Sequence, residues 1–175
     1  MSEQQLPISE NLAFEIVSEP AAQEHLLMLK DRWHGEKNLG MRVHHHLGGK
    51  TIYFGNIKQQ WFKSVVKRYA LYLRTQGKSF GTLHNKVQII SDFSIFLEVR
   101  NVYSFKEIDD EILSGYVGSL SRLAESTRRK HMVDIRTFFD TGTINGWFNI
   151  STYCLRGETG RVKPEKINYI MRMLV

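Results

Sequence analysis

The chain contains little of what disulfide-linked, zinc-centred or membrane-spanning proteins require. Of its 175 residues, one is cysteine and three are proline. Cys154 has no second cysteine with which to form a disulfide or share a structural zinc ion, so we expect a reduced thiol without a structural role. No run of about 18 apolar residues is present, as a membrane-spanning helix would require. The acidic, polar start is unlike a signal peptide, so we expect a cytoplasmic protein without a membrane partner.

The remaining composition is typical of a folded protein with one main core, because 42% of the residues are hydrophobic and 24% are charged. The formal net charge of +6 is unevenly distributed. Lys and Arg number five against seven acidic residues in 1–56, fourteen against nine in 57–150, and five against two in 151–175. A basic excess from residue 57 onward favours a polyanionic partner, although many basic domains bind nothing acidic.

Apolar residues at helical spacing predict a first helix over about residues 57–75, which Gly77 ends. Lys63, Lys67 and Arg74 fall along one stripe on its other side. For Lys63 and Lys67, contact with a phosphate backbone and simple solvation remain equally open.

Three further helices follow at similar spacing. Ser79 can cap a second helix that reaches about Val99, Ser104 a third that reaches about Leu120, and Ser126 a fourth. The third opens with acidic residues, which suit the helix dipole but make phosphate contact unfavourable.

The fourth helix opens with a cationic cluster, Arg128, Arg129 and Lys130 followed by His131. Cations near a helix N-terminus cost about 0.3–1 kcal/mol at exposed sites, so the cluster suggests an anionic partner. The buried face of this helix is predicted to consist of Met132, Ile135, Phe138 and Phe139. We expect the helix to end at Gly142, Asn145 and Gly146. The aromatic residues that follow, Trp147 and Phe148, are expected to pack back on the bundle.

Residues 1–56 are predicted to form a partly irregular N-terminal leader segment, with a short helix over 23–33 and a loop or short β-like segment over 41–55. Three consecutive histidines at 44–46 could bind a metal, but neighbouring side chains cannot all face one ion on a regular helix or strand. We therefore expect no metal site. Polar and glycine residues after Asn149 predict a linker over 151–175.

The second and fourth helices open with similar sets of side chains. One opens Ser-Phe-Gly-Thr-Leu-His-Asn-Lys from residue 79, and the other Ser-Thr-Arg-Arg-Lys-His from residue 126. Hydroxyls and amides can bind phosphates, while Asn, Arg and Lys can reach base edges. Over about residues 57–150, the helix order and these openings resemble the core-binding domain of tyrosine recombinases, the phage-integrase superfamily. The stretch from Asp31 to Ile57 resembles the leader of some longer integrases.

The resemblance implies an all-α fold, a four- to five-helix SAM-like core-binding bundle with a small leader. It also implies binding of a double-stranded recombination site beside other recombinase subunits, with the second and fourth helices in the major groove. The DNA-contact candidates are then Ser79, Thr82, Asn85, Lys86, Ser126, Thr127, Arg129 and Lys130.

Recombinase chemistry requires residues that the family carries on a separate catalytic domain: a tyrosine nucleophile, two arginines, a lysine and a His-x-x-Arg motif. No histidine here is followed three residues later by arginine. We therefore expect no catalytic residue, no cofactor and no enzyme activity of the chain by itself, with the linker leading toward a missing domain. Tyr153 and Tyr169 are not interpreted as nucleophiles.

Two other functions remain open, a helical protein-interaction module and a stand-alone DNA-binding regulator. For an arbitrary basic run, a solvated helix start is the more common explanation, and the paired openings, Ser-x-x-Thr at residue 79 and Ser-Thr at residue 126, favour DNA here. Five aromatic residues are predicted to pack in the core rather than stack on bases, because they lie at core spacing: Trp61, Phe93, Phe96, Phe138 and Phe139.

Overall fold

The computed structural model describes residues 19–43 and 50–157, with side chains from residue 23 to residue 156. The chain divides into two compact units, residues 1–30 and residues 31–175. The described part of the first unit is helix α1, Glu19–Leu29. The helix predicted over 23–33 therefore begins and ends four residues earlier than expected.

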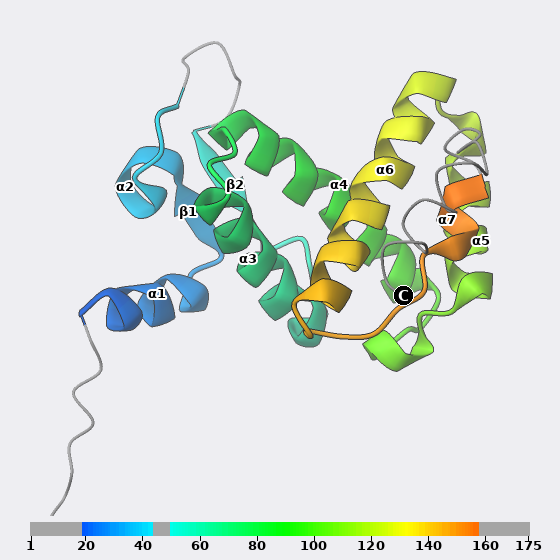
Figure 1. Cartoon of the computed structure of the whole chain (residues 1–175), viewed down its shortest axis with the longest axis horizontal. Helices are drawn as coiled ribbons and strands as arrows, with labels where there is room; N and C mark the ends of the chain where they lie inside the picture. Colours follow the sequence, from blue (N-terminus) through cyan, green and yellow to red (C-terminus); the bar gives the residue numbers. More distant parts are fainter. Residues whose placement is uncertain (1–18, 44–49, 158–175) are drawn as a thin grey trace, which may run out of the picture. The chain divides into compact units, whose positions relative to one another are not determined.

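The second unit begins with a two-stranded antiparallel sheet (Figure 1). Strand β1, Arg32–His34, pairs with β2, Thr51–Tyr53, and the short helix α2, Gly35–Leu39, follows β1 directly. Trp33 lies opposite Ile52 in the register, and both side chains are buried. This pairing explains why Trp33 is not helical, since its indole fills the core from a strand.

The ring of Phe54 meets Trp33 edge-on, with 4.7 Å between the ring centroids. Residues 31–56 thus contribute to the core of the same compact unit as the bundle. The β-like segment predicted at the end of 41–55 is confirmed, whereas the histidines at 44–46 lie outside the described residues.

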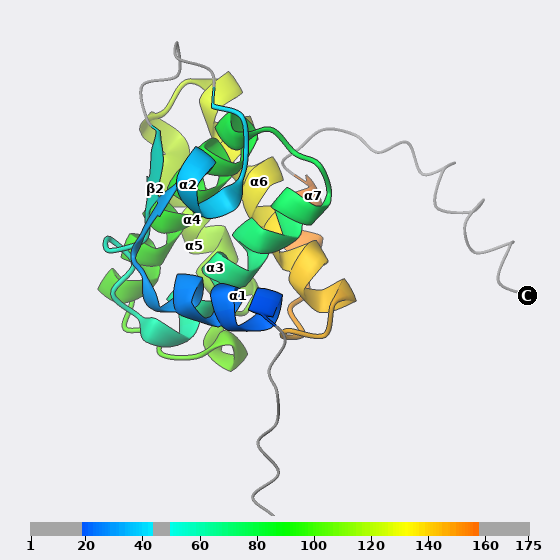
Figure 2. The ribbon, with the colours of Figure 1, turned by 90° about the vertical axis from the view of Figure 1, so that its left-hand side faces the viewer.

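The rest of the second unit is helical, which confirms the predicted all-α bundle (Figures 1 and 2). Among the residues that the structure describes, its helices are α3 Gln60–Thr75, α4 Phe80–Val99, α5 Asp110–Ser119, α6 Glu125–Ile144 and α7 Tyr153–Gly157, with 3₁₀ turns at Phe105–Glu107 and Leu120–Arg122.

Phenylalanine rings from α3, α4 and α6 form the centre of the core. Phe62 lies 5.7 Å from Phe138 and Phe93 lies 5.6 Å from Phe139 between ring centroids, and all four rings are fully buried. The predicted core role of Phe93, Phe138 and Phe139 is therefore confirmed. Two further aromatics from the same prediction, Trp61 and Phe96, are half-buried at the edge of the core.

The aromatic residues after α6 pack back on the bundle, as predicted. The ring of Phe148 stacks on Phe105 with 4.3 Å between centroids, and Trp147 meets Tyr72 at 6.1 Å. Gly142 does not end the helix but lies within α6. A Cβ atom at Gly142 would lie 2.0 Å from the Phe148 ring, so glycine is required there for close approach.

Three of the helix starts predicted for the bundle are wrong by a few residues, those of α3, α5 and α6. The first predicted helix begins at Gln60 and not at about residue 57. The third helix begins at Asp110, where the Asp109 carboxylate accepts from the amide of Ile112 at 2.9 Å. Ser104 instead precedes the 3₁₀ turn and donates to Glu107 at 2.9 Å. Aspartate caps a helix as well as serine does. The acidic residues 109–111 therefore supply the cap, Asp109, as well as the start of the first turn.

The residues that follow α6 belong to the bundle as far as the structure describes them. Ile150, Thr152 and Leu155 are buried, and α7 packs on α5 and α6. Part of the predicted linker therefore packs on the bundle, since Thr152 and Leu155 contribute side chains to the core.

Candidate nucleic-acid interface

The start of α4 is built as the sequence predicts. Ser79 has an extended backbone, and its hydroxyl accepts from the amide of Thr82 at 3.2 Å. The two hydroxyl oxygens lie 2.9 Å apart. Asn85, one turn further on, is exposed, and its side chain forms no hydrogen bond with a described residue. These side chains present two hydroxyls and an amide at the outer end of the helix.

The start of α6 differs from the prediction. The helix begins at Glu125 after Ala124, which provides no side-chain cap, so Ser126 lies in the first turn instead of capping it. Ser126, Thr127 and Lys130 are exposed. A carboxylate in the first turn is favourable for the helix dipole, which explains why this helix can begin before its serine.

An ion pair joins the two helices below their starts. Lys86 on α4 contacts Asp134 on α6, and their side chains are 17% and 10% exposed. Lys86 was predicted to contact DNA, and in the structure its ammonium group lies against Asp134 between two helices. Asp134 is not among the predicted site residues; the signal for it is a carboxylate next to the buried Ile135.

Residues three, four or seven apart share a face of a helix. Ser79 and Thr82 therefore lie on the same face of α4 as Lys86, and Thr127 and Lys130 on the same face of α6 as Asp134. Five of the eight predicted contacts, these four and Lys86, are thus brought onto the facing sides of two neighbouring helices.

Arg129 lies on another side of α6, because it is five residues from Asp134. Its guanidinium is 3.6 Å from the carboxylate of Glu125. Both side chains are more than half exposed, so the pair contributes little stability. Asn85 also lies on a different side of α4 from Lys86, because adjacent residues in a helix do not share a face.

The two helix starts lie on the same side of the second unit. In Figure 1, α4 and α6 both begin at the upper edge and converge below it, and Figure 2 again places both starts at the top. Phe80 packs into the core, but Ser79 at one start and Ser126 and Thr127 at the other are exposed. Side chains from both helices can therefore reach one elongated partner.

A second contact fixes α6 against α5. The Tyr116 hydroxyl lies 3.2 Å from Nδ1 of His131 in the second turn of α6. Burial raises the pKa of Tyr116 well above its usual range, so the phenol stays protonated. His131, part of the predicted cationic cluster, thus contacts the neighbouring helix.

Lys63 and Lys67 face neither a free surface nor solvent, so both alternatives left open for them are wrong. Their ammonium groups lie 2.8 and 2.9 Å from the carboxylate of Asp31, and both side chains are buried. The hydrogen bond from Lys63 and the charge of Lys67 hold the pKa of Asp31 below its usual value, although burial opposes them. These two lysines contribute to the attachment of residue 31 to α3.

Neither metal nor thiol chemistry is supported in the described residues. No group of three His, Cys, Asp or Glu side chains among them could hold a metal ion. Burial, with a hydrogen bond to Asp110, raises the pKa of the Cys154 thiol to about 11, so it is a weak nucleophile at neutral pH. No helix in the described part of the chain has both the length and the apolar character needed to cross a bilayer.

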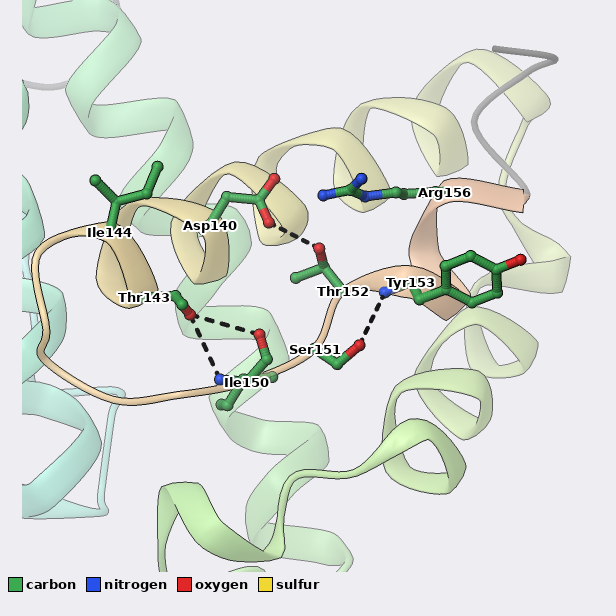
Figure 3. A pocket seen from close by; sticks show the side chains of 8 residues that line it. All are labelled: Asp140, Thr143, Ile144, Ile150, Ser151, Thr152, Tyr153 and Arg156. Atoms are coloured by element: carbon green, nitrogen blue, oxygen red, sulfur yellow. Dashed lines mark hydrogen bonds between the residues drawn. The ribbon is translucent and has the colours of Figure 1, made fainter. Parts of the chain in front are cut away.

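A pocket of about 530 Å³ lies at the other end of α6 (Figure 3). Asp140 in its wall accepts a hydrogen bond from Thr152 at 2.7 Å, and the Thr143 hydroxyl bridges to the backbone of Ile150. These bonds attach the segment before α7 to α6. The lining holds no histidine and no second carboxylate, so among the described residues it offers no acid–base pair.

Comparison with known proteins identifies the bundle. The family model of the phage integrase SAM-like domain matches residues 66–159, more than half of the chain. The match runs from the middle of α3 past α7 and therefore includes both helix starts. No curated protein and no solved structure matches.

Proposed function

Because the chain belongs to the phage integrase SAM-like domain family, we propose that it binds double-stranded DNA as the core-binding part of a site-specific tyrosine recombinase. DNA cleavage and rejoining would then depend on catalytic residues outside the matched domain. The role of residues 31–157 is to hold the duplex.

One observation carries the proposal: the exposed starts of α4 and α6 lie on the same side of one compact unit (Figure 1). Hydroxyls at Ser79, Thr82 and Thr127 are suited to phosphate contacts, and Lys130 supplies a cation between them. The ion pair of Lys86 with Asp134 fixes the separation of the helices, so the contacts are preorganised.

The distribution of charge also favours DNA contact on the side that carries the starts of α4 and α6. The cations that open α6 lie at the positive end of its dipole, where an anionic partner would offset the cost. The start of α5 is acidic instead, with Asp109, Asp110 and Glu111, and is not proposed to contact DNA.

The test is duplex binding in a gel-shift or anisotropy assay at several salt concentrations. We expect binding that weakens steeply with salt, and Lys130→Gln should lower the slope of log K against log [salt] by about one unit. Arg129→Gln should lower it less, because Arg129 lies on another side of α6 and already faces Glu125.

Lys106→Gln is the matched control, because Lys106 is exposed in the turn before α5 and should leave the slope unchanged. Absence of duplex binding by the wild-type chain would contradict the proposed function. Equal slopes for Lys130→Gln and Lys106→Gln would contradict the assignment of α6.

Other recombinase subunits are the second partner that we propose. Ile95 and Val99, one turn apart on α4, and the nearby Tyr103 are 48%, 73% and 68% exposed. They lie toward the end of α4 that is opposite its proposed DNA contact. Sedimentation of the chain with and without a duplex long enough for two copies tests this; independent binding of copies would contradict it.

A further inference from the structure

A second cavity, of about 410 Å³, lies beside the start of α4. Leu39, the last residue of α2, and residues 40–42 line one part of it, and Arg74 with residues 77–80 lines the rest. The cavity thus joins the segment that precedes the matched family domain to the end of α3 and the cap of α4.

The described side chains that line this cavity include three cations, Arg42, Arg74 and Lys78, and no acid. All three are exposed, and none forms an ion pair with a described residue. Three positive charges around one hollow repel each other unless an anion lies among them. By contrast, the charges of Lys63 and Lys67 on α3 are already neutralised by the carboxylate of Asp31.

The walls of the cavity are held by tight packing. A Cβ atom at Gly35 would lie 2.5 Å from Val43 and 2.7 Å from the ring of Phe80, and both side chains are buried. The α2 segment therefore packs directly on the first residue of α4. The cavity does not have to be assembled when a ligand binds.

Gly40 turns the chain toward the cations. It ends α2 with a φ of +61°, in the left-handed region, and the amide of Met41 bonds to the carbonyl of Gly35 at 2.9 Å. A Cβ atom at Gly40 would lie 4.0 Å from the guanidinium of Arg74. The turn thus brings Arg42 onto the same hollow as the end of α3.

We propose that Arg42, Arg74 and Lys78 form a pocket for a backbone phosphate of the DNA that α4 contacts. Guanidinium groups match the geometry of phosphate oxygens, and the start of the 20-residue helix α4 adds the positive end of its dipole. Ser79 belongs to both sites, so the pocket continues the proposed interface.

The pocket extends that interface away from α6. In Figure 1 the start of α4 lies between α2 and the start of α6. A duplex that contacts both helix starts would therefore pass the pocket at one side. This inference rests on the proposed function, and it adds residues that precede the family domain to the DNA contact.

The experiment measures duplex affinity against salt for the full chain and for the double variant Arg42→Gln/Arg74→Gln. Two lost phosphate contacts should lower the slope of log K against log [salt] by up to about two units. Both side chains are exposed, so the variant should keep the wild-type circular dichroism spectrum and melting temperature.

The control is Lys58→Gln/Lys106→Gln, two exposed cations that lie outside the pocket and precede α3 and α5. A lowered slope in the pocket variant with an unchanged slope in the control supports the proposal. Equal slopes for the two variants, while Lys130→Gln still weakens binding, overturn the pocket and leave the proposed function standing. Absence of duplex binding by the wild type overturns both.

Titration with inorganic phosphate in place of the duplex separates a DNA backbone from a small anion. Phosphate binding that is lost in Arg42→Gln/Arg74→Gln, together with an unchanged duplex slope, would assign the pocket to a small anion and overturn the proposal. Weak phosphate binding together with a lowered duplex slope supports it.

Discussion

The Asp31 carboxylate accepts hydrogen bonds from two ammonium groups, those of Lys63 and Lys67 at 2.8 and 2.9 Å. Both lysines are buried while Asp31 is 42% exposed on its side chain. The loss of one charged acceptor would therefore leave two cations next to the core, which costs more than the loss of a surface pair.

We expect Asp31→Asn to lower the free energy of unfolding by about 1–3 kcal/mol, less than for a fully buried pair because water still reaches the carboxylate. The pKa of Asp31 is lowered in the folded state, so its contribution is complete above the unfolded pKa and is lost as pH falls through the folded pKa. Urea unfolding of both proteins at neutral pH and at a series of acid pH values that extends below the lowered pKa of Asp31 checks this. A difference that persists unchanged in acid would contradict it.

Gly142 makes a second prediction at the scale of one residue. Gly142→Ala should destabilise the protein by about 1–3 kcal/mol, because the new methyl group would overlap the Phe148 ring. Gly118→Ala is the matched control, since nothing lies within 4 Å of a Cβ atom there, and alanine should stabilise α5 by up to about 1 kcal/mol. Thermal melts of the two variants should therefore shift in opposite directions.

At the scale of helices, the pair of Lys86 and Asp134 sets how α4 and α6 meet. Asp134→Ala should lower the free energy of unfolding by about 3–5 kcal/mol, since it leaves the Lys86 ammonium largely buried without its partner. The double variant Lys86→Met/Asp134→Leu should recover most of that loss, because two apolar side chains can fill the space. Denaturant unfolding measures both variants, and a double variant less stable than Asp134→Ala would contradict the account.

Helical spacing predicts the elements well where one face of a helix is buried. The α4 and α6 core stripes, including Leu83, Val87, Ile135 and Phe138, are buried as expected, and α4 has the predicted cap. The first turns of α5 and α6 were harder to locate, since Asp109 and Ser104 can both cap a helix and Ala124 gives no signal. Local spacing also could not show that Lys63, Lys67 and Lys86 find acids 32, 36 and 48 residues away in sequence.

At the scale of the whole molecule, the resemblance of the helical region to the phage-integrase superfamily is confirmed by the match of its SAM-like domain over residues 66–159. The organisation before residue 57 was less predictable, because β1 and β2 have three residues each and owe their stability to Trp33, Ile52 and Phe54 in a shared core. The proposed interface depends on the same long-range packing, which places two helix starts 45 residues apart on one side of a compact unit.

Amide chemical-shift mapping would show whether the starts of α4 and α6 contact one duplex together. The labelled chain would be titrated with duplex DNA, and shift changes would be followed residue by residue. We expect the largest changes in two clusters, residues 79–86 and residues 125–131, and we expect both clusters to saturate at the same DNA concentration. Changes confined to one cluster, or concentrated at the acidic start of α5, would contradict it.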